Sequence, residues 1–93
     1  MPWYHVDIEV TDILESGTCN YGHKVGDSYS TMNECRGVCS AAFHTLYPYI
    51  VALRSGGSLP WEDDPEVAYI CCPDHKNPVV FKLTRNREDD TED

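Results

Sequence analysis

The segment WYHVDIEVTDIL, from Trp3 to Leu14, decides the fold of this 93-residue chain. Apolar and polar side chains alternate along it, and the apolar positions are Tyr4, Val6, Ile8 and Val10. Because successive side chains of a strand point to opposite faces of a sheet, this pattern predicts a β-strand with one buried face. The rest of the chain must supply the strands that pair with it and the layer that covers it.

The neighbouring segments predict three more strands and one helical segment. KVGDSYS, residues 24–30, can return as a short second strand after a glycine-containing loop. VAYICC, residues 67–72, and PVVFKLTR, residues 78–85, are β-rich runs joined by PDHKN, which predicts a second hairpin. Between the hairpins, apolar residues of the segment 38–54 recur at helical spacing. Pro48 interrupts this spacing, so the segment is either a kinked helix or two short helices.

This order of elements predicts an α+β protein. We expect a ββαββ arrangement, in which one Pro-interrupted helical segment lies across a four-stranded, mainly antiparallel sheet. Residues 1–86 would form a single domain, as the length of the chain favours. The last seven residues, REDDTED (87–93), carry five acidic side chains, one basic side chain and no apolar side chain. This composition predicts a disordered acidic tail.

The charge of the chain excludes several classes of partner. Seven basic and sixteen acidic side chains give a net charge of −9, which repels phosphate backbones and anionic lipids, so we expect neither nucleic acid nor a membrane as a partner. No apolar run has the length of a spanning helix, and the N-terminal residues do not resemble a signal peptide. We therefore expect a cytoplasmic protein, in which its five cysteines are free or bound to a metal.

Three of the cysteines lie where predicted elements begin or end. Cys19 lies in the glycine-containing loop GTCNYGHKVGD, Cys39 at the start of the helical segment and Cys72 at the end of a strand. A ββαββ fold can bring these three positions together, with His23 as a possible fourth ligand. Three cysteines and one histidine form a known zinc site, and three thiolates with an open position suit an iron–sulfur cluster. A metal or cluster site at Cys19, His23, Cys39 and Cys72 is thus the first hypothesis.

The spacing of the cysteines leaves two other hypotheses open. Structural zinc sites usually have two closely spaced ligand pairs, and CRGVC, from Cys35 to Cys39, has no second such pair. The second hypothesis is a metal-free thiol enzyme, in which a cysteine such as Cys19 is a nucleophile or redox centre and His23 or Asp27 transfers a proton. The third is a non-catalytic module that forms homo-oligomers through its sheet edges or aromatic surface, with its cysteines buried.

Purely structural roles are also open for the polar residues of the loop. The ring of His23 can hydrogen-bond the turn backbone, and the carboxylate of Asp27 can cap backbone amides. The chain has no phosphate loop, dinucleotide fingerprint or nucleophile elbow. The sequence therefore assigns no reaction and no small-molecule substrate.

Four motifs extend over most of the chain. They are CNYGHKVGD (Cys19 to Asp27), GVC (Gly37 to Cys39), ALRSGGSLPW (Ala52 to Trp61) and CPDHKNPVVF (Cys72 to Phe81). They fit the patterns C-x-x-G-H-x-x-G-D, G-x-C, A-L-R-x-G-G-x-x-P-W and C-P-D-x-x-N-P-V-V-F, and with them the chain resembles a small family of uncharacterised prokaryotic proteins of similar length. The resemblance implies that the family's cysteines are Cys19, Cys39 and Cys72, and that Cys35 and Cys71 are additions in this sequence. It implies no activity.

Overall fold

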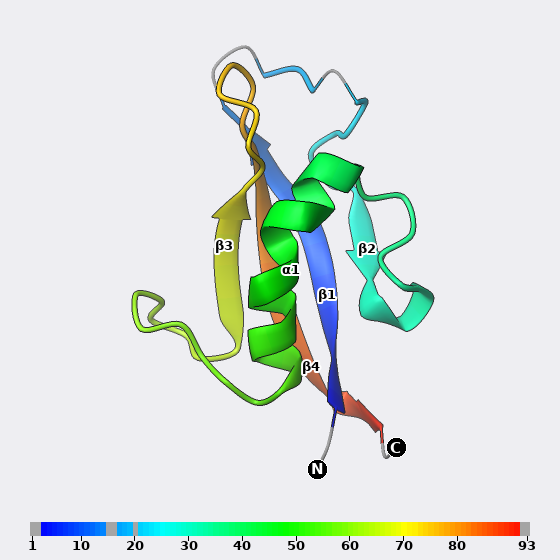
Figure 1. Cartoon of the computed structure of the whole chain (residues 1–93), viewed down its shortest axis with the longest axis vertical. Coiled ribbons are helices and arrows are strands. Elements are labelled where there is room, and N and C mark those ends of the chain that lie inside the picture. Colours follow the sequence, from blue (N-terminus) through cyan, green and yellow to red (C-terminus); the bar gives the residue numbers. More distant parts are fainter. Residues whose placement is uncertain (1–2, 15–16, 20, 92–93) are drawn as a thin grey trace.

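A four-stranded sheet with one helix across one face forms the described part of the chain, residues 3–14, 17–19 and 21–91 of a computed structural model (Figure 1). The elements are β1 (Trp3–Ile13), β2 (Ser28–Ser30), the 3₁₀ turn η1 (Thr31–Asn33), α1 (Ser40–Arg54), β3 (Val67–Cys71) and β4 (Val79–Thr91). The predicted α+β class, with an antiparallel four-stranded sheet and a single helix, is confirmed.

The sheet has the strand order β2-β1-β4-β3, and all its pairings are antiparallel. The long strands β1 and β4 lie at its centre, where Ile8 is opposite Leu83 and Val6 is opposite Arg85. The alternation in β1 has the predicted result, because Val6, Ile8 and Val10 are buried whereas Asp7 and Glu9 are exposed. β4 adds Val79, Phe81 and Leu83 to the same buried face.

The segment around Pro48 forms one continuous helix, α1. Its buried side chains are Ala42, Leu46, Ile50 and Leu53. Pro48 lies inside the helix on its exposed side, so water can bond the carbonyl group that proline leaves without an N–H partner. The sequence allowed either one kinked helix or two short helices, and the prediction of two short helices is wrong. No helix in the described ranges is long and apolar enough to cross a membrane.

The C-terminal strand is longer than the sequence predicts. β4 continues to Thr91, which is paired with Trp3 at the beginning of β1. Residues 87–91, which we assigned to the acidic tail, thus lie within the last part of a strand. The register of the β1–β4 pairing is irregular between Trp3 and His5, and pairing resumes at Thr91. Residues 92–93 lie outside the described residues.

A buried arginine connects the C-terminal end of α1 to the sheet. Arg85 follows Phe81 and Leu83 on the inner face of β4 and is buried. Its Nε and Nη2 donate to the two carboxylate oxygens of Glu66 at 3.1 and 3.0 Å. Nη1 donates to the carbonyl oxygens of Leu53 and Gly57 at 2.8 and 2.6 Å, and Nη2 donates to that of Pro65 at 3.1 Å. All five N–H groups of the guanidinium are therefore hydrogen-bonded.

The other end of α1 lies among loops. In Figure 1 the β1–β2 loop, the β3–β4 loop and the start of α1 meet at the top of the molecule, whereas the chain termini lie at the bottom. This arrangement gathers the three cysteine-bearing segments at one end of the sheet.

Candidate functional site

A pocket of about 310 Å³ lies at this end of the molecule, between the β1–β2 loop, the start of α1 and the β3–β4 loop. It is lined by Cys19, Tyr21, His23, Cys39, Ala41, Ala42, Cys72, Pro73, Asp74 and Val79. Its volume is at the lower end of the range for small-molecule sites.

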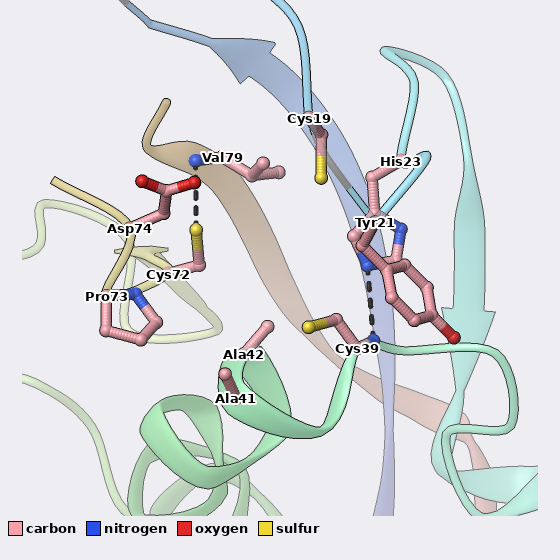
Figure 2. Close-up of a pocket in the computed structure, with 10 residues that line it drawn as sticks. All are labelled: Cys19, Tyr21, His23, Cys39, Ala41, Ala42, Cys72, Pro73, Asp74 and Val79. Carbon is pink, nitrogen blue, oxygen red and sulfur yellow. Dashed lines mark hydrogen bonds between the residues drawn. The ribbon is translucent and has the colours of Figure 1, made fainter. Parts of the chain in front are cut away.

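The structure brings together the three cysteines that the sequence places at element ends. Figure 2 shows the sulfur atoms of Cys19, Cys39 and Cys72 on different sides of the same space. The other two cysteines do not line this pocket: Cys35 is buried elsewhere, and Cys71 is exposed on the edge strand β3. Burial raises the pKa of the Cys35 thiol and so keeps it protonated.

The three thiols do not converge on one point. Among the described residues, no group of three or more His, Cys, Asp or Glu side chains is placed to hold a single metal ion. A tetrahedral zinc site needs sulfur atoms about 2.3 Å from a shared centre. The pocket instead has thiols around a space that is larger than one ion.

Cys72 is held at the end of β3 by its partner strand. Its N–H donates to the carbonyl of Val79 at 2.9 Å, and the N–H of Val79 donates to the Cys72 sulfur at 3.3 Å. In the following turn, one carboxylate oxygen of Asp74 accepts from the N–H groups of Lys76 and Asn77 at 2.9 and 3.3 Å. These hydrogen bonds lower the pKa of the Asp74 carboxyl group, and the one from Lys76 has the larger effect. Asp74 therefore stays ionised.

Cys39 is the N-cap residue of α1. Its carbonyl accepts the first helical hydrogen bond, from the N–H of Phe43 at 2.8 Å, but its side chain caps no amide of the first turn. The small side chains of Ala41 and Ala42 leave the pocket open beside this turn. The first amides of a helix have no partner within the helix, and their positive end favours negative charge, as a thiolate carries.

His23 is buried, with 4% of its surface exposed, and both of its ring nitrogens are hydrogen-bonded. Nε2 accepts from the N–H of Cys39 at 3.2 Å, and Nδ1 lies 2.8 Å from the hydroxyl of Tyr29. Because a nitrogen that accepts carries no proton, the neutral ring holds its proton on Nδ1 and donates it to Tyr29. Burial lowers the pKa of His23, against the opposing effect of Asp27, which favours this neutral form. His23 thus orients the start of α1, and a metal on Nε2 would take the acceptor of the Cys39 N–H.

Tyr29 connects His23 to Asp27. Burial, with the nearby Asp27 carboxylate, raises the pKa of Tyr29 to about 12, so its hydroxyl stays protonated and donates to Asp27 Oδ2 at 3.4 Å. The same oxygen accepts from the N–H of Lys24 at 2.9 Å. Asp27 does not line the pocket. The structure therefore gives it the role of capping the turn and orienting Tyr29.

Sequence reasoning missed Tyr29, whose position depends on two features that only the structure shows. Tyr29 is opposite Ile8 in the β1–β2 pairing and therefore lies on the inner face of the sheet. Gly37 lies against its ring, where a Cβ atom would be 3.1 Å from the Cε1 atom of Tyr29, and Gly37 has a φ of +99°. The glycine of the G-x-C motif thus makes room for the tyrosine that supports His23.

No protein-family model, curated protein or solved structure matches this chain. The family resemblance stays a prediction, and the structure gives the motifs a physical meaning. The described residues of Cys19–Asp27, Gly37–Cys39 and Cys72–Phe81 lie at the pocket end of the molecule, whereas Ala52–Trp61 contains the C-terminal end of α1 and the loop that follows it (Figure 1). The carbonyl groups that bond Arg85 include two from that last motif.

Proposed function

We propose that the protein binds an iron–sulfur cluster through Cys19, Cys39 and Cys72. The observation that carries the proposal is that these three thiols surround one pocket without converging on a point. In a cluster, thiolates bind different iron atoms, so their sulfur atoms stay apart. A single zinc ion would need the same sulfur atoms to move to one shared centre.

The number of thiols favours a four-iron cluster. A two-iron cluster is held by four cysteines, two on each iron, which requires the ligands to approach in pairs. A four-iron cluster needs one thiolate per iron, and three separate thiols can occupy three of its corners. Three ligands on three different segments suit this arrangement.

Two of the thiols lie beside backbone N–H groups. The N–H of Val79 points to the Cys72 sulfur, and the positive end of α1 lies beside Cys39. Hydrogen bonds to the sulfur atoms and the local charge tune the reduction potential of such clusters. The cytoplasmic location expected from the sequence would keep the cysteines reduced and ready to bind iron.

Anaerobic reconstitution of the purified protein with iron and sulfide tests the proposal. We expect thiolate-to-iron absorption and stoichiometric iron and sulfide in the wild type. Cys19→Ser, Cys39→Ser and Cys72→Ser should each lose most of this iron, whereas the matched controls Cys35→Ser and Cys71→Ser should retain it. Equal iron content in all five variants would contradict the proposal, as would about one zinc per chain without cluster absorption.

The position of Cys39 favours a metal-free thiol enzyme as the second candidate function. Cys39 is at the N-cap of α1 and opens onto the pocket, and reactive cysteines commonly lie at helix N-termini. Among the thiols it is a better nucleophile candidate than Cys19. His23 accepts from the Cys39 backbone and not from a thiol, so the base of such an enzyme stays unassigned. Alkylation of the apo protein, followed by mass spectrometry, should then label Cys39 at least about tenfold faster than Cys71; equally slow labelling would contradict it.

Homo-oligomer formation through the sheet edges stays a prediction. One edge strand, β2, has three residues, and on the other, β3, the N–H of Tyr69 already donates to a carboxylate oxygen of Glu62 at 2.8 Å. Short or covered edges hinder pairing with a second chain. Light scattering at micromolar concentration tests the prediction, and a monomer would contradict it.

A further inference from the structure

We infer that one iron of the cluster has no protein ligand and binds a small anionic ligand, with an oxygen or sulfur donor atom, from solution. The inference rests on the proposed cluster. It follows from the side chains that surround the pocket, since three cysteines can occupy only three of the four irons.

His23 is not placed to be the fourth ligand. Its Nε2 accepts from the N–H of Cys39, and its Nδ1 donates to Tyr29. If Nε2 bound iron, the partly buried Cys39 amide would lose its acceptor. Loss of such buried hydrogen bonds is costly, and the ring also lies in edge contact with Phe81, at a centroid distance of 5.6 Å.

The other candidates for a fourth ligand either hold a turn or lie outside this pocket. Asp74 uses one carboxylate oxygen to hold two backbone N–H groups of its own turn. Cys35 lines a different pocket, beside Phe43 and Tyr47. Cys71 is exposed and opposite Val80, on the other face of the sheet from the partly buried Ile70. Within the part of the chain that the structure describes, the pocket therefore offers three ligands with no fourth in place.

The walls of the pocket define the class of ligand. Ala41, Ala42 and Val79 are small or apolar and offer no hydrogen bond from their side chains. Tyr21 is 59% exposed at the rim, and Figure 2 shows its hydroxyl directed away from the three sulfur atoms. An anionic donor would bind the iron and lie near the positive end of α1. The net charge of −9 opposes large polyanions, so the ligand is small and carries little charge, as a carboxylate or thiolate does.

Controlled oxidation of the reconstituted wild-type protein tests the open position. Ferricyanide takes one electron from the cluster, and the iron without a cysteine leaves as Fe²⁺, converting a [4Fe–4S]²⁺ cluster to a [3Fe–4S]⁺ cluster. We expect bound iron to fall from about four to about three per chain, with the electron paramagnetic resonance signal of a three-iron cluster. A cluster that keeps all its iron under the same conditions would overturn the inference.

Addition of acetate or ethanethiol to the reduced four-iron cluster tests the class of ligand. We expect each compound to shift the electron paramagnetic resonance spectrum until the effect saturates. If neither compound shifts the spectrum, the inference is overturned while the cluster proposal stays intact. Asp74→Asn should give the same ligand-free spectrum as the wild type, because Asn can still cap the turn; a changed spectrum would identify Asp74 as the fourth ligand and overturn the open position. Failure to assemble any cluster would overturn both proposals.

Discussion

The two ends of α1 are built in opposite ways. At its C-terminal end, all five N–H groups of the buried Arg85 are bonded to carbonyl and carboxylate oxygens. At its N-terminal end, Cys39 caps no amide of the first turn, and small side chains leave a pocket of about 310 Å³. The difference shows that this helix is fastened to the sheet by an arginine at one end and borders a pocket at the other, where His23 bonds the Cys39 N–H. Substitutions at the two ends should therefore have different effects on stability and, under the proposed function, on iron binding.

Arg85→Met should have the largest effect on stability, because it removes the hydrogen bonds that fasten the C-terminal end of α1 to the sheet. The substitution removes the arginine's hydrogen bonds to three carbonyl groups and to Glu66, so we expect the free energy of unfolding to fall by about 2–4 kcal/mol. Urea denaturation measures it. The exposed Arg36 provides the control, since Arg36→Met should change stability by less than about 0.5 kcal/mol. Equal effects at the two arginines would show that the C-terminal end is not specially stabilised.

Tyr29→Phe should weaken the partly buried hydrogen-bond network of His23, Tyr29 and Asp27 at the pocket end. The buried His23 loses its hydrogen-bond partner on Nδ1, so we expect a loss of about 1–2 kcal/mol in urea denaturation. Tyr47→Phe, at an exposed tyrosine of α1, is the matched control and should be nearly neutral. A neutral Tyr29→Phe would mean that the imidazole is held by its other contacts alone.

Cys39→Ser should stabilise the apo protein and at the same time remove cluster iron. Serine is a far better N-cap than a side chain that makes no capping bond, so we expect a gain of about 0.5–1 kcal/mol in the free energy of unfolding. Cys39→Ala should give no such gain, because alanine cannot cap. Iron content and urea denaturation measured on the same preparations check both parts. A destabilised Cys39→Ser would show that the cysteine is there for packing rather than for binding.

Glu34→Gly should increase the free energy of unfolding by a similar or smaller amount, at a turn away from both ends of α1. Glu34 has a φ of +62° after η1, where its N–H bonds the carbonyl of Thr31 and the N–H of Cys35 bonds that of Ser30. This is the pattern in which helices favour glycine, so we expect a gain of about 0.5 kcal/mol. Glu34→Ala removes the same carboxylate but keeps the Cβ atom and should not stabilise. Equal thermal midpoints for both variants would contradict the explanation.

The pH dependence of stability should show the smallest effect, because Asp27 partly offsets the burial of His23. The pKa of His23 in the folded protein lies below the ordinary value of 6.5. As the pH decreases, the unfolded chain therefore binds this proton before the folded protein does. Stability should therefore be full above about pH 6.5 and fall as the pH decreases toward the folded pKa. Urea denaturation at pH 7.5 and 5.5 should show a smaller decrease for His23→Asn than for the wild type, whereas His44→Asn should leave the decrease unchanged. Equal decreases in all three proteins would exclude His23 as the source.

The candidate site was only partly predictable. Cys19, Cys39 and Cys72 could be selected because residues at the ends of elements meet at the ends of a sheet, and the structure places all three around one pocket. His23 lines the same pocket, but its hydrogen bonds to Cys39 and Tyr29 make it an orienting residue. Asp27 lies outside the pocket. The roles of these side chains depend on partners that are distant in the sequence, which spacing does not reveal.

The sequence by itself determined the kinds of element and their order. The period-two alternation of β1 and the helical spacing before Arg54 depend on local geometry, because each element buries one face whatever its neighbours are. Only the tertiary structure decided the strand order, the pairing of β4 up to Thr91, the burial of Arg85 and the distance that keeps the three thiols apart. These features depend on contacts between residues far apart in the chain, and the free energy of such contacts is fixed only when the sheet brings their partners together.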